Sequence, residues 1–196
     1  MNEISAKLVG ELRSRTGAGI INCKKALVET NGNIEEAIIA LRKNGAISAA
    51  KKADRQTTEG IIESYIHHGG RIGVLLELNC ETDFVARNSD FKQLAHDICM
   101  HIAASNPLFI SKDDVPENLI EKEKEIAMVQ ASGKSPVAIE KIVHGKIDKW
   151  INQVCLLNQS FIKDQDKTIS NLLIEYISKI GENIKISRFV RFQLGE

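Results

Sequence analysis

Hydrophobic residues in the first part of the chain recur at helical spacing. Ile4, Leu8 and Leu12 stand at i, i+4 and i+8, which predicts an amphipathic helix. This helix is expected to end before the glycine pair Gly17 and Gly19. A second short helix is expected after these glycines, with Asn22 as its N-cap. The glycine pair lacks the spacing and the preceding strand of a phosphate-binding loop, so we interpret it as a turn.

A third helix is predicted after Asn31-Gly32. Asn33 is expected to cap it, with Glu36 three residues later as in a capping box, and Gly45 is expected to end it. Its buried face comprises Ile34, Ile38 and Leu41. Three helices in so short a segment bury little area, and such bundles are more often docking modules than enzymes.

The next segment changes to the pattern of a β-hairpin. Residues 60–66 and 71–79 are rich in β-branched and aliphatic residues, and His67-His68-Gly69-Gly70 supplies the turn between them. After this hairpin, helical spacing returns from Asn88 or Ser89 and ends at Asn106-Pro107. The buried stripe of that helix is predicted to contain Phe91, Leu94, Ala95, Ile98, Cys99 and Ile102.

The sequence after Pro107 predicts further helices and a final strand that joins the sheet. A charged helix is expected from about Glu117 to Ala131, ended by Gly133, and Pro136 opens a longer helix. A loop at residues 157–161 leads to a last helix. The final strand places on one face Ile184, Ile186, Val190, Phe192 and Leu194, with Arg188 as the exception. The prediction is an α+β fold, in which an N-terminal three-helix bundle is followed along the chain by an antiparallel sheet with layered helices.

Charge and aromatic residues divide the chain in two. The net charge is zero, but residues 1–55 carry +4 and residues 56–196 carry −4, and the first aromatic residue is Tyr65. We therefore predict an N-terminal helical docking domain at 1–55 and an α+β core and dimerisation domain at 56–196. A net charge of zero argues against a protein that binds nucleic acid chiefly through contacts with the phosphate groups.

Composition excludes further classes. No apolar run reaches the length of a membrane helix, and the N-terminus resembles neither a signal nor a transit peptide, so a cytoplasmic location is expected. The four cysteines form no C-x-x-C pair, so we expect buried free thiols and no metal site. No acid–base pair stands out, and neither a catalytic residue nor a cofactor is predicted. A rival reading, an enzyme that uses Cys80 as nucleophile, requires a thiol of lowered pKa.

The connection at residues 80–86 suggests a binding role in addition to a structural one. Residues 80–86, Cys-Glu-Thr-Asp-Phe-Val-Ala, follow the hairpin and precede the next helix. Thr82 or Asp83 suits the cap of a brief helical turn, which would project Phe84 from the connection. The alternatives are a Phe84 buried in its own core and a Phe84 presented as an anchor for another protein.

Three stretches resemble the elongation factor Ts family. They are LRSRTGAGIINCKKAL at 12–27, NCETDFVA at 79–86 and ISRFVRFQLGE at 186–196. The resemblance is dense over residues 1–105 and continues more thinly beyond them. It implies a non-enzymatic protein that binds the GDP form of elongation factor Tu, displaces Mg²⁺ and promotes GDP release.

The resemblance also implies roles for single residues. It makes Asp83 and Phe84, framed by Thr82 and Val85, the wedge that enters the partner beside its nucleotide site, so an exposed Phe84 is expected. It likens the bundle to ubiquitin-associated domains. The residues that match its docking surface are Leu12, Arg13, Ile20, Ile21 and Lys24.

The chain differs from longer members, which have a duplicated core. One core implies the short form, in which two chains associate, so a homodimer through the sheet side is predicted. No direct nucleic-acid or membrane partner is implied. The alternative from another class is a non-catalytic helical docking module for an unrelated protein, which predicts no effect on GDP release.

Overall fold

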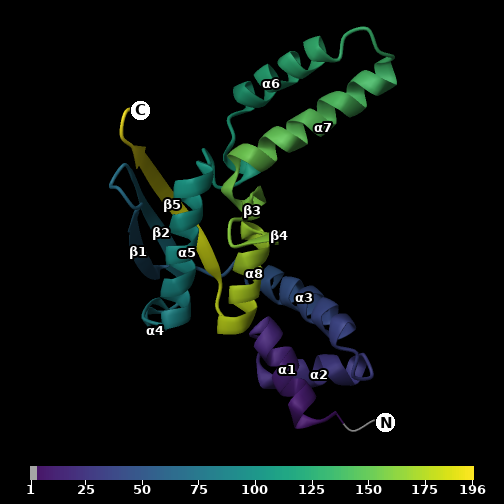
Figure 1. Ribbon diagram of the computed structural model, residues 1–196, viewed down its shortest axis with the longest axis vertical. Coiled ribbons are helices and arrows are strands. Elements are labelled where there is room, and N and C mark those ends of the chain that lie inside the picture. The colour runs from purple at the N-terminus through teal and green to yellow at the C-terminus, as the bar shows by residue number, and fades with distance from the viewer. Residues whose placement is uncertain (1–3) are drawn as a thin grey trace. The chain divides into compact units, whose positions relative to one another are not determined.

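The described part of the chain combines helices with a small antiparallel sheet (Figure 1). The structure is a computed structural model that describes residues 4–196. It confirms the predicted α+β class. The chain forms two compact units, one from the residues up to Ile61 with Leu78–Leu94 and Asn171–Ser187, the other from Ile62–Glu77, Ala95–Ser170 and Arg188–Glu196. The predicted domain division at 55/56 differs from this grouping and stays a prediction.

Three helices open the first unit: α1 (Ala6–Thr16), α2 (Ile20–Glu29) and α3 (Ile34–Ala50). They share a buried cluster that consists of Val9, Leu12, Cys23, Ala26, Leu27 and Ala37. The expected helical face of α3, with Ile34, Ile38 and Leu41, packs against this cluster while half-buried. The likeness of these helices to ubiquitin-associated domains stays a prediction.

Of the two predicted asparagine caps, one is confirmed. Asn33 Oδ1 accepts hydrogen bonds from the backbone N–H groups of Glu35 and Glu36, at 3.1 and 3.3 Å. The predicted cap at Asn22 is wrong, because α2 begins at Ile20 and its N-cap is Gly19, three residues before Asn22. The Gly19 carbonyl accepts from Cys23 N at 2.9 Å, so the backbone starts this helix without a side-chain cap.

The predicted end of the third helix at Gly45 is also wrong. Gly45 lies buried inside α3, and a Cβ at this position would lie 3.6 Å from the Ser178 side chain in α8 (Ile169–Ile180). A glycine within a helix costs only about 1 kcal/mol relative to alanine, which tertiary packing readily offsets. A Cβ at this distance would make an ordinary van der Waals contact, so packing against α8 does not require a glycine here.

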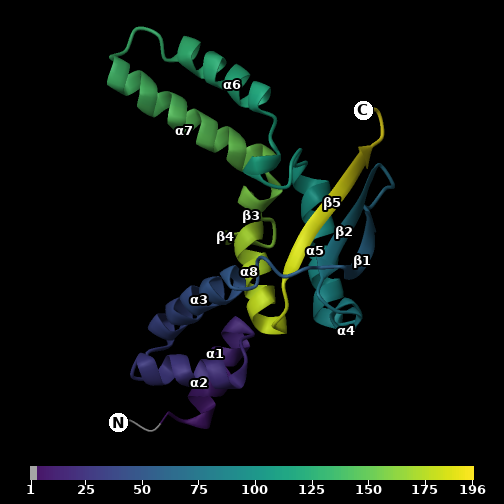
Figure 2. The ribbon, with the colours of Figure 1, turned by 180° about the vertical axis from the view of Figure 1, so that it is seen from behind.

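The sheet contains β1 (Glu59–Ile66), β2 (Ile72–Cys80) and β5 (Ile184–Gln193) in the order β1-β2-β5, and Figure 2 shows β5 beside β2. The predicted hairpin turn is present, since His67 N donates to the Ile72 carbonyl at 2.9 Å. The predicted alternation in β5 is present, but its face is buried only at Ile184 and Ile186.

Helix α5 (Ser89–Ser105) has the predicted buried stripe, since each of the six predicted residues is fully buried. Within the second unit its C-terminal part covers one face of the sheet: Cys99 Sγ lies 3.8 Å from the Glu63 carbonyl, and Arg191 Nε donates to the Ala103 carbonyl at 3.3 Å.

The second unit also contains a helical hairpin of α6 (Glu117–Gln130) and α7 (Pro136–Val154), as predicted. Its buried cluster consists of Val115, Ala127, Val143, Ile147, Ile151 and Cys155. The sequence analysis missed a small second sheet of β3 (Ser160–Phe161) and β4 (Asp164–Thr168). Strand β4 is polar throughout and lacks the apolar alternation that reveals a strand.

A buried histidine makes the stability of the fold depend on pH. His101 is fully buried in α5, and its Nε2 donates to Gln159 Oε1 at 2.9 Å, because the Gln159 amide donates to the Gln153 carbonyl. Its Nδ1 has no hydrogen-bond partner among the described residues. Burial therefore lowers the pKa of His101, although the bond to Gln159 opposes the shift.

We expect the free energy of unfolding to be greatest above pH 6.5 and to fall as the pH drops below that value. The unfolded chain binds the proton there, with an ordinary histidine pKa of about 6.5, while the folded chain does not. Denaturant unfolding between pH 5 and 8 measures the slope, which His101→Gln should reduce. The exposed His68→Gln is the control and should keep the slope; an equal slope in His101→Gln contradicts the assignment.

Candidate functional site

A short helical turn follows β2 and projects Phe84. Helix α4 (Asp83–Ala86) has Thr82 as its N-cap, and the Thr82 hydroxyl accepts from Val85 N at 3.4 Å. Cys80 before the turn and Ala86 at its end are buried, whereas Phe84 is 81% exposed. The expected exposure of Phe84 is therefore observed. Its role as a wedge stays a prediction.

The residues that frame Phe84 have polar or half-buried environments. Asp83 pairs with Arg87 at 2.9 Å, Oδ2 to Nη2, on the surface of the turn. Thr82 and Val85 are half-buried. A carboxylate in the first turn of a helix interacts favourably with its N–H groups, so Asp83 supports the turn locally.

Contacts from a distant segment hold the start of this turn. Glu182, which lies between α8 and β5, accepts hydrogen bonds from the backbone of Glu81 and Thr82 and from the Thr82 hydroxyl. The sequence analysis missed this residue. A single sequence carries no signal that joins positions 100 residues apart; only the folded chain brings them together.

The thiol of Cys80 lacks the properties of a nucleophile. It is fully buried, and its Sγ donates to the Thr82 carbonyl at 3.2 Å. Burial, with the nearby Glu182 carboxylate, raises the pKa of Cys80 to about 11. At neutral pH this thiol is protonated, which counts against the reading of an enzyme with a Cys80 nucleophile.

We expect Cys80 to resist alkylation in the native chain. A rise in pKa to about 11 reduces the thiolate at neutral pH by about 100-fold, and burial slows the reagent further. Iodoacetamide labelling followed by peptide mass spectrometry, with and without guanidinium, measures the difference. Native labelling as fast as that in guanidinium contradicts the expectation.

A second surface lies on α1 and α2 of the same unit. Ile20 and Ile21 are 55% and 83% exposed at the start of α2, and Arg13 in α1 and Lys24 in α2 are exposed as well. Leu12 is fully buried in the bundle cluster, so its predicted place in the docking surface is wrong. It was matched to the family stretch, but its position on the apolar stripe of α1 directs it into the core.

The histidines and acidic residues of the described chain form no group of three or more that could hold a metal ion. His96 Nδ1 instead lies 3.1 Å from Glu63 Oε1, and the neighbouring Cys99 is buried. Burial and the Glu63 carboxylate raise the pKa of Cys99 to about 12, which fits the packing role expected for it.

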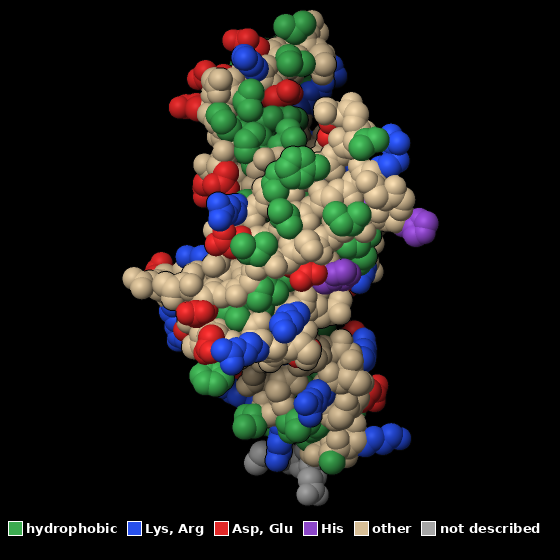
Figure 3. Space-filling model, turned by 90° about the vertical axis from the view of Figure 1, so that its left-hand side faces the viewer, with side chains coloured by type: hydrophobic (Ala, Val, Ile, Leu, Met, Phe, Trp, Pro, Cys, Tyr) green, Lys and Arg blue, Asp and Glu red, His purple; other side chains and the backbone are tan. Residues whose placement is uncertain are grey.

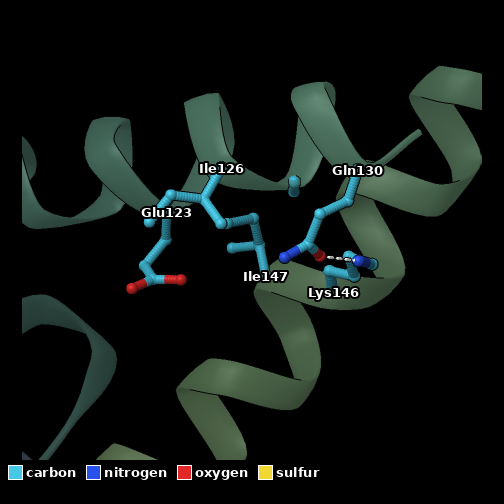
Figure 4. Close-up of a pocket in the computed structure, with 6 residues that line it drawn as sticks. Glu123, Ile126, Gln130, Lys146 and Ile147 are labelled. Atoms are coloured by element: carbon cyan, nitrogen blue, oxygen red, sulfur yellow. Dashed lines mark hydrogen bonds between the residues drawn. The ribbon is translucent and has the colours of Figure 1, made fainter. Parts of the chain in front are cut away.

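A pocket on the helical hairpin lacks polar groups arranged to bind a ligand. It lies between α6 and α7 and is lined by Glu123, Ile126, Ala127, Gln130, Lys146 and Ile147. Figure 4 shows Lys146 bonded to Gln130, with the Glu123 carboxylate pointing away from both. The polar groups do not converge on one position, and we assign no ligand to this pocket.

The sheet has an apolar outer face, opposite the face that α5 covers. Its residues, between 40% and 69% exposed, are Ile62, Ile66, Leu75, Val190, Phe192 and Leu194. Arg188 and Glu77 on the same face pair at 2.7 Å. Figure 3 faces the sheet side and shows hydrophobic side chains gathered among charged ones. We call these six residues the outer sheet patch.

Comparison with known proteins identifies close relatives. The model of the family described as elongation factor TS matches residues 18–196. The chain is 56% identical over 195 residues to elongation factor Ts of Syntrophomonas wolfei, covering 98% of this chain and 91% of the relative. It is 57% identical over 196 residues to elongation factor Ts of Fervidobacterium nodosum, covering 99% and 100%. For Thermosipho melanesiensis the identity is 56% over 195 residues, covering 98% and 100%.

Proposed function

The chain belongs to the elongation factor Ts family and is a translation elongation factor, and from this premise we propose that it is a guanine nucleotide exchange factor for elongation factor Tu. It binds the GDP form, displaces Mg²⁺, promotes GDP release and stays bound until GTP binds. The proposed role is non-enzymatic and uses no cofactor. It places the protein in the cytoplasm, with no direct nucleic-acid or membrane partner. In the described part of the chain, no helix has the length and apolar character to cross a membrane.

The observation that carries the proposal is the exposed Phe84. Large aromatic side chains are normally buried, and a ring left 81% exposed on a capped turn is suited to enter a pocket on another protein. By family resemblance that pocket lies beside the nucleotide of elongation factor Tu. A ring inserted there disturbs the groups that hold Mg²⁺ and the phosphates, on which tight nucleotide binding depends.

The physical basis of the exchange is differential binding. A protein promotes release of a ligand from its partner only when it binds the ligand-free partner more tightly. The factor itself then needs no nucleotide pocket. The coupling is reciprocal, so GDP weakens binding of the factor by the same ratio as the factor weakens binding of GDP.

The proposal is tested by the release of a fluorescent GDP analogue from elongation factor Tu in a stopped-flow instrument. The full chain should accelerate release in proportion to its concentration until the partner is saturated. Unchanged release would leave the docking of another protein as the function of the bundle.

The exposed residues of the bundle are proposed to dock the partner without acting on the nucleotide. Replacing Ile21 by aspartate should weaken binding to elongation factor Tu by about tenfold or more, because a charge would enter an apolar contact. The melting temperature should not change, since Ile21 is 83% exposed. Isothermal titration measures the affinity. Ile39→Asp, at an exposed position of α3 outside the predicted surface, is the control; an equal effect of both variants contradicts the assignment.

The protein is proposed to form a homodimer through the outer sheet patch. The patch joins apolar residues of three adjacent strands with Leu194 directly after β5, and Arg188 and Glu77 form an ion pair within this face. A two-fold axis places the same patch on both copies, so two sheets can pack face to face and remove all six side chains from water. Contiguous exposed apolar surface of this kind usually marks an interface.

A further inference from the structure

The turn that carries Phe84 is too short to hold its own conformation. Helix α4 has four residues, and its closing bonds run from Ala86 N to the Thr82 carbonyl and from Arg87 N to the Asp83 carbonyl, at 3.2 and 3.1 Å. Isolated helices of this length are unstable in water. Phe84 itself is too exposed to anchor the turn by packing. The direction of its ring therefore depends on groups outside the turn.

Glu182 supplies three such contacts from the other end of the chain. Its Oε2 accepts from Glu81 N at 3.1 Å and from Thr82 N at 3.0 Å, and its Oε1 accepts from the Thr82 hydroxyl at 2.6 Å. Hydrogen bonds to a charged carboxylate are shorter and stronger than those between neutral groups. All three end on the two residues that immediately precede α4.

The position of Glu182 is itself fixed. Helix α8 ends at Ile180, and the φ of +92° at the next residue, Gly181, lets the chain reverse into β5 within three residues. The next residue, Asn183, is 2% exposed, and its backbone N–H donates to Glu81 Oε1 at 2.6 Å. Residues 81–82 thus donate to Glu182 while residue 183 donates to Glu81, and the two segments are bound reciprocally.

The same network reaches the segment after the N-terminal bundle. The Asn183 amide donates to the carbonyls of Ala53 and Arg55, at 3.2 and 3.0 Å, and Arg55 Nη1 lies 3.3 Å from Glu81 Oε1. Asn183 is therefore a structural residue that joins three segments. Glu182 differs from it, because its three hydrogen bonds all end on Glu81 and Thr82, at the start of the Phe84 turn.

We propose that Glu182 is a positioning residue for nucleotide exchange, whose carboxylate fixes Thr82 and thereby the direction in which Phe84 projects. This inference rests on the proposed function of Phe84. A variant without the carboxylate still carries Phe84, but its turn samples other orientations and the ring no longer projects in one direction. The maximal acceleration of GDP release then falls, while binding through the N-terminal bundle is retained.

The test measures GDP release by the full-length Glu182→Gln variant over a range of concentrations. We expect the maximal acceleration to fall about tenfold, as for loss of a charged hydrogen bond, and the half-saturating concentration to change less than about twofold. Glu121→Gln, at an exposed position of α6, is the matched control and should equal the wild type. Equal maximal acceleration in Glu182→Gln and wild type overturns the proposal.

A second variant keeps Glu182 and removes one of its three hydrogen-bond donors. Thr82→Val is similar in shape and lacks the hydroxyl, which donates to Glu182 and accepts from Val85 N. If both act through one hydrogen-bonded unit, the double variant should lose little more activity than either single variant. Losses that multiply in the double variant overturn the proposal.

Amide hydrogen exchange of the free chain separates this inference from the proposed function. In Glu182→Gln the Thr82 amide should lose protection while the core amide of Ile98 keeps it. Unaltered protection at Thr82 overturns the proposal even when the wild type is active. If the wild type itself fails to accelerate release, the proposed exchange function fails first, and the positioning role falls with it.

Discussion

Replacing Phe84 by alanine is expected to remove most of the acceleration of GDP release while leaving the fold intact. A buried phenylalanine would cost about 3–5 kcal/mol on truncation. Phe84 is 81% exposed, so its removal should cost no more than about 0.5 kcal/mol and leave the melting temperature within about 2 °C. An anchor residue at an interface contributes about 2 kcal/mol or more, which corresponds to a loss of at least about 30-fold.

Thermal unfolding and GDP release measured on one sample separate a wedge from a core residue. Leu108→Ala, which removes another exposed apolar side chain, is the matched control and should preserve both properties. Asp83→Ala should have a smaller effect, since Asp83 supports the turn through Arg87 and the helix N-terminus only. An unstable Phe84→Ala variant that still accelerates release would return Phe84 to a structural role.

Placing a charge in the outer sheet patch is expected to separate the homodimer. In a two-fold interface Phe192→Asp introduces two carboxylates among apolar side chains, and burying them unpaired is costly. The dissociation constant of the dimer should rise by about 100-fold or more. Sedimentation equilibrium at micromolar concentration should give twice the 21.7 kDa chain mass for the wild type and the chain mass for the variant.

The control for this experiment adds the same charge elsewhere. Gln165→Asp lies at an exposed position of the polar strand β4 and should remain dimeric. A monomeric wild type would refute the homodimer. A dimeric Phe192→Asp variant would place the interface on a different surface.

Hydrophobic periodicity predicted the helices and the main sheet because it reports which face of each element is buried. The stripe on α5 and the hairpin of β1 and β2 were found in this way. The same signal did not reveal the polar strand β4. Periodicity also placed Val190, Phe192 and Leu194 on one face, but it could not show that these three side chains are exposed in the described structure, because burial depends on what packs against them.

Local residue preferences were less reliable where tertiary contacts compete with them. Gly45 was expected to end its helix, yet α3 continues through it to Ala50, because one glycine inside a helix costs only about 1 kcal/mol. Asn22 is a good cap, but the α2 backbone already begins at Ile20.

The candidate site was predicted in part. The connection at residues 80–86 pointed to an exposed Phe84 through its short polar residues and its family resemblance, and the exposure is observed. The contribution of Glu182 was not predictable, since it arises only when the turn after α8 meets the end of β2. Leu12 was misassigned because a family stretch includes both surface residues and the core residues beneath them.

The most direct test of the proposed exchange mechanism is the affinity of the chain for elongation factor Tu in its nucleotide-free and GDP-bound forms. Isothermal titration of both forms at one Mg²⁺ concentration gives the ratio of the two dissociation constants. Differential binding predicts that the nucleotide-free form binds much more tightly, by the ratio in which the chain weakens GDP binding. Equal affinity for the two forms would contradict it, since a protein that binds both forms equally cannot displace the nucleotide.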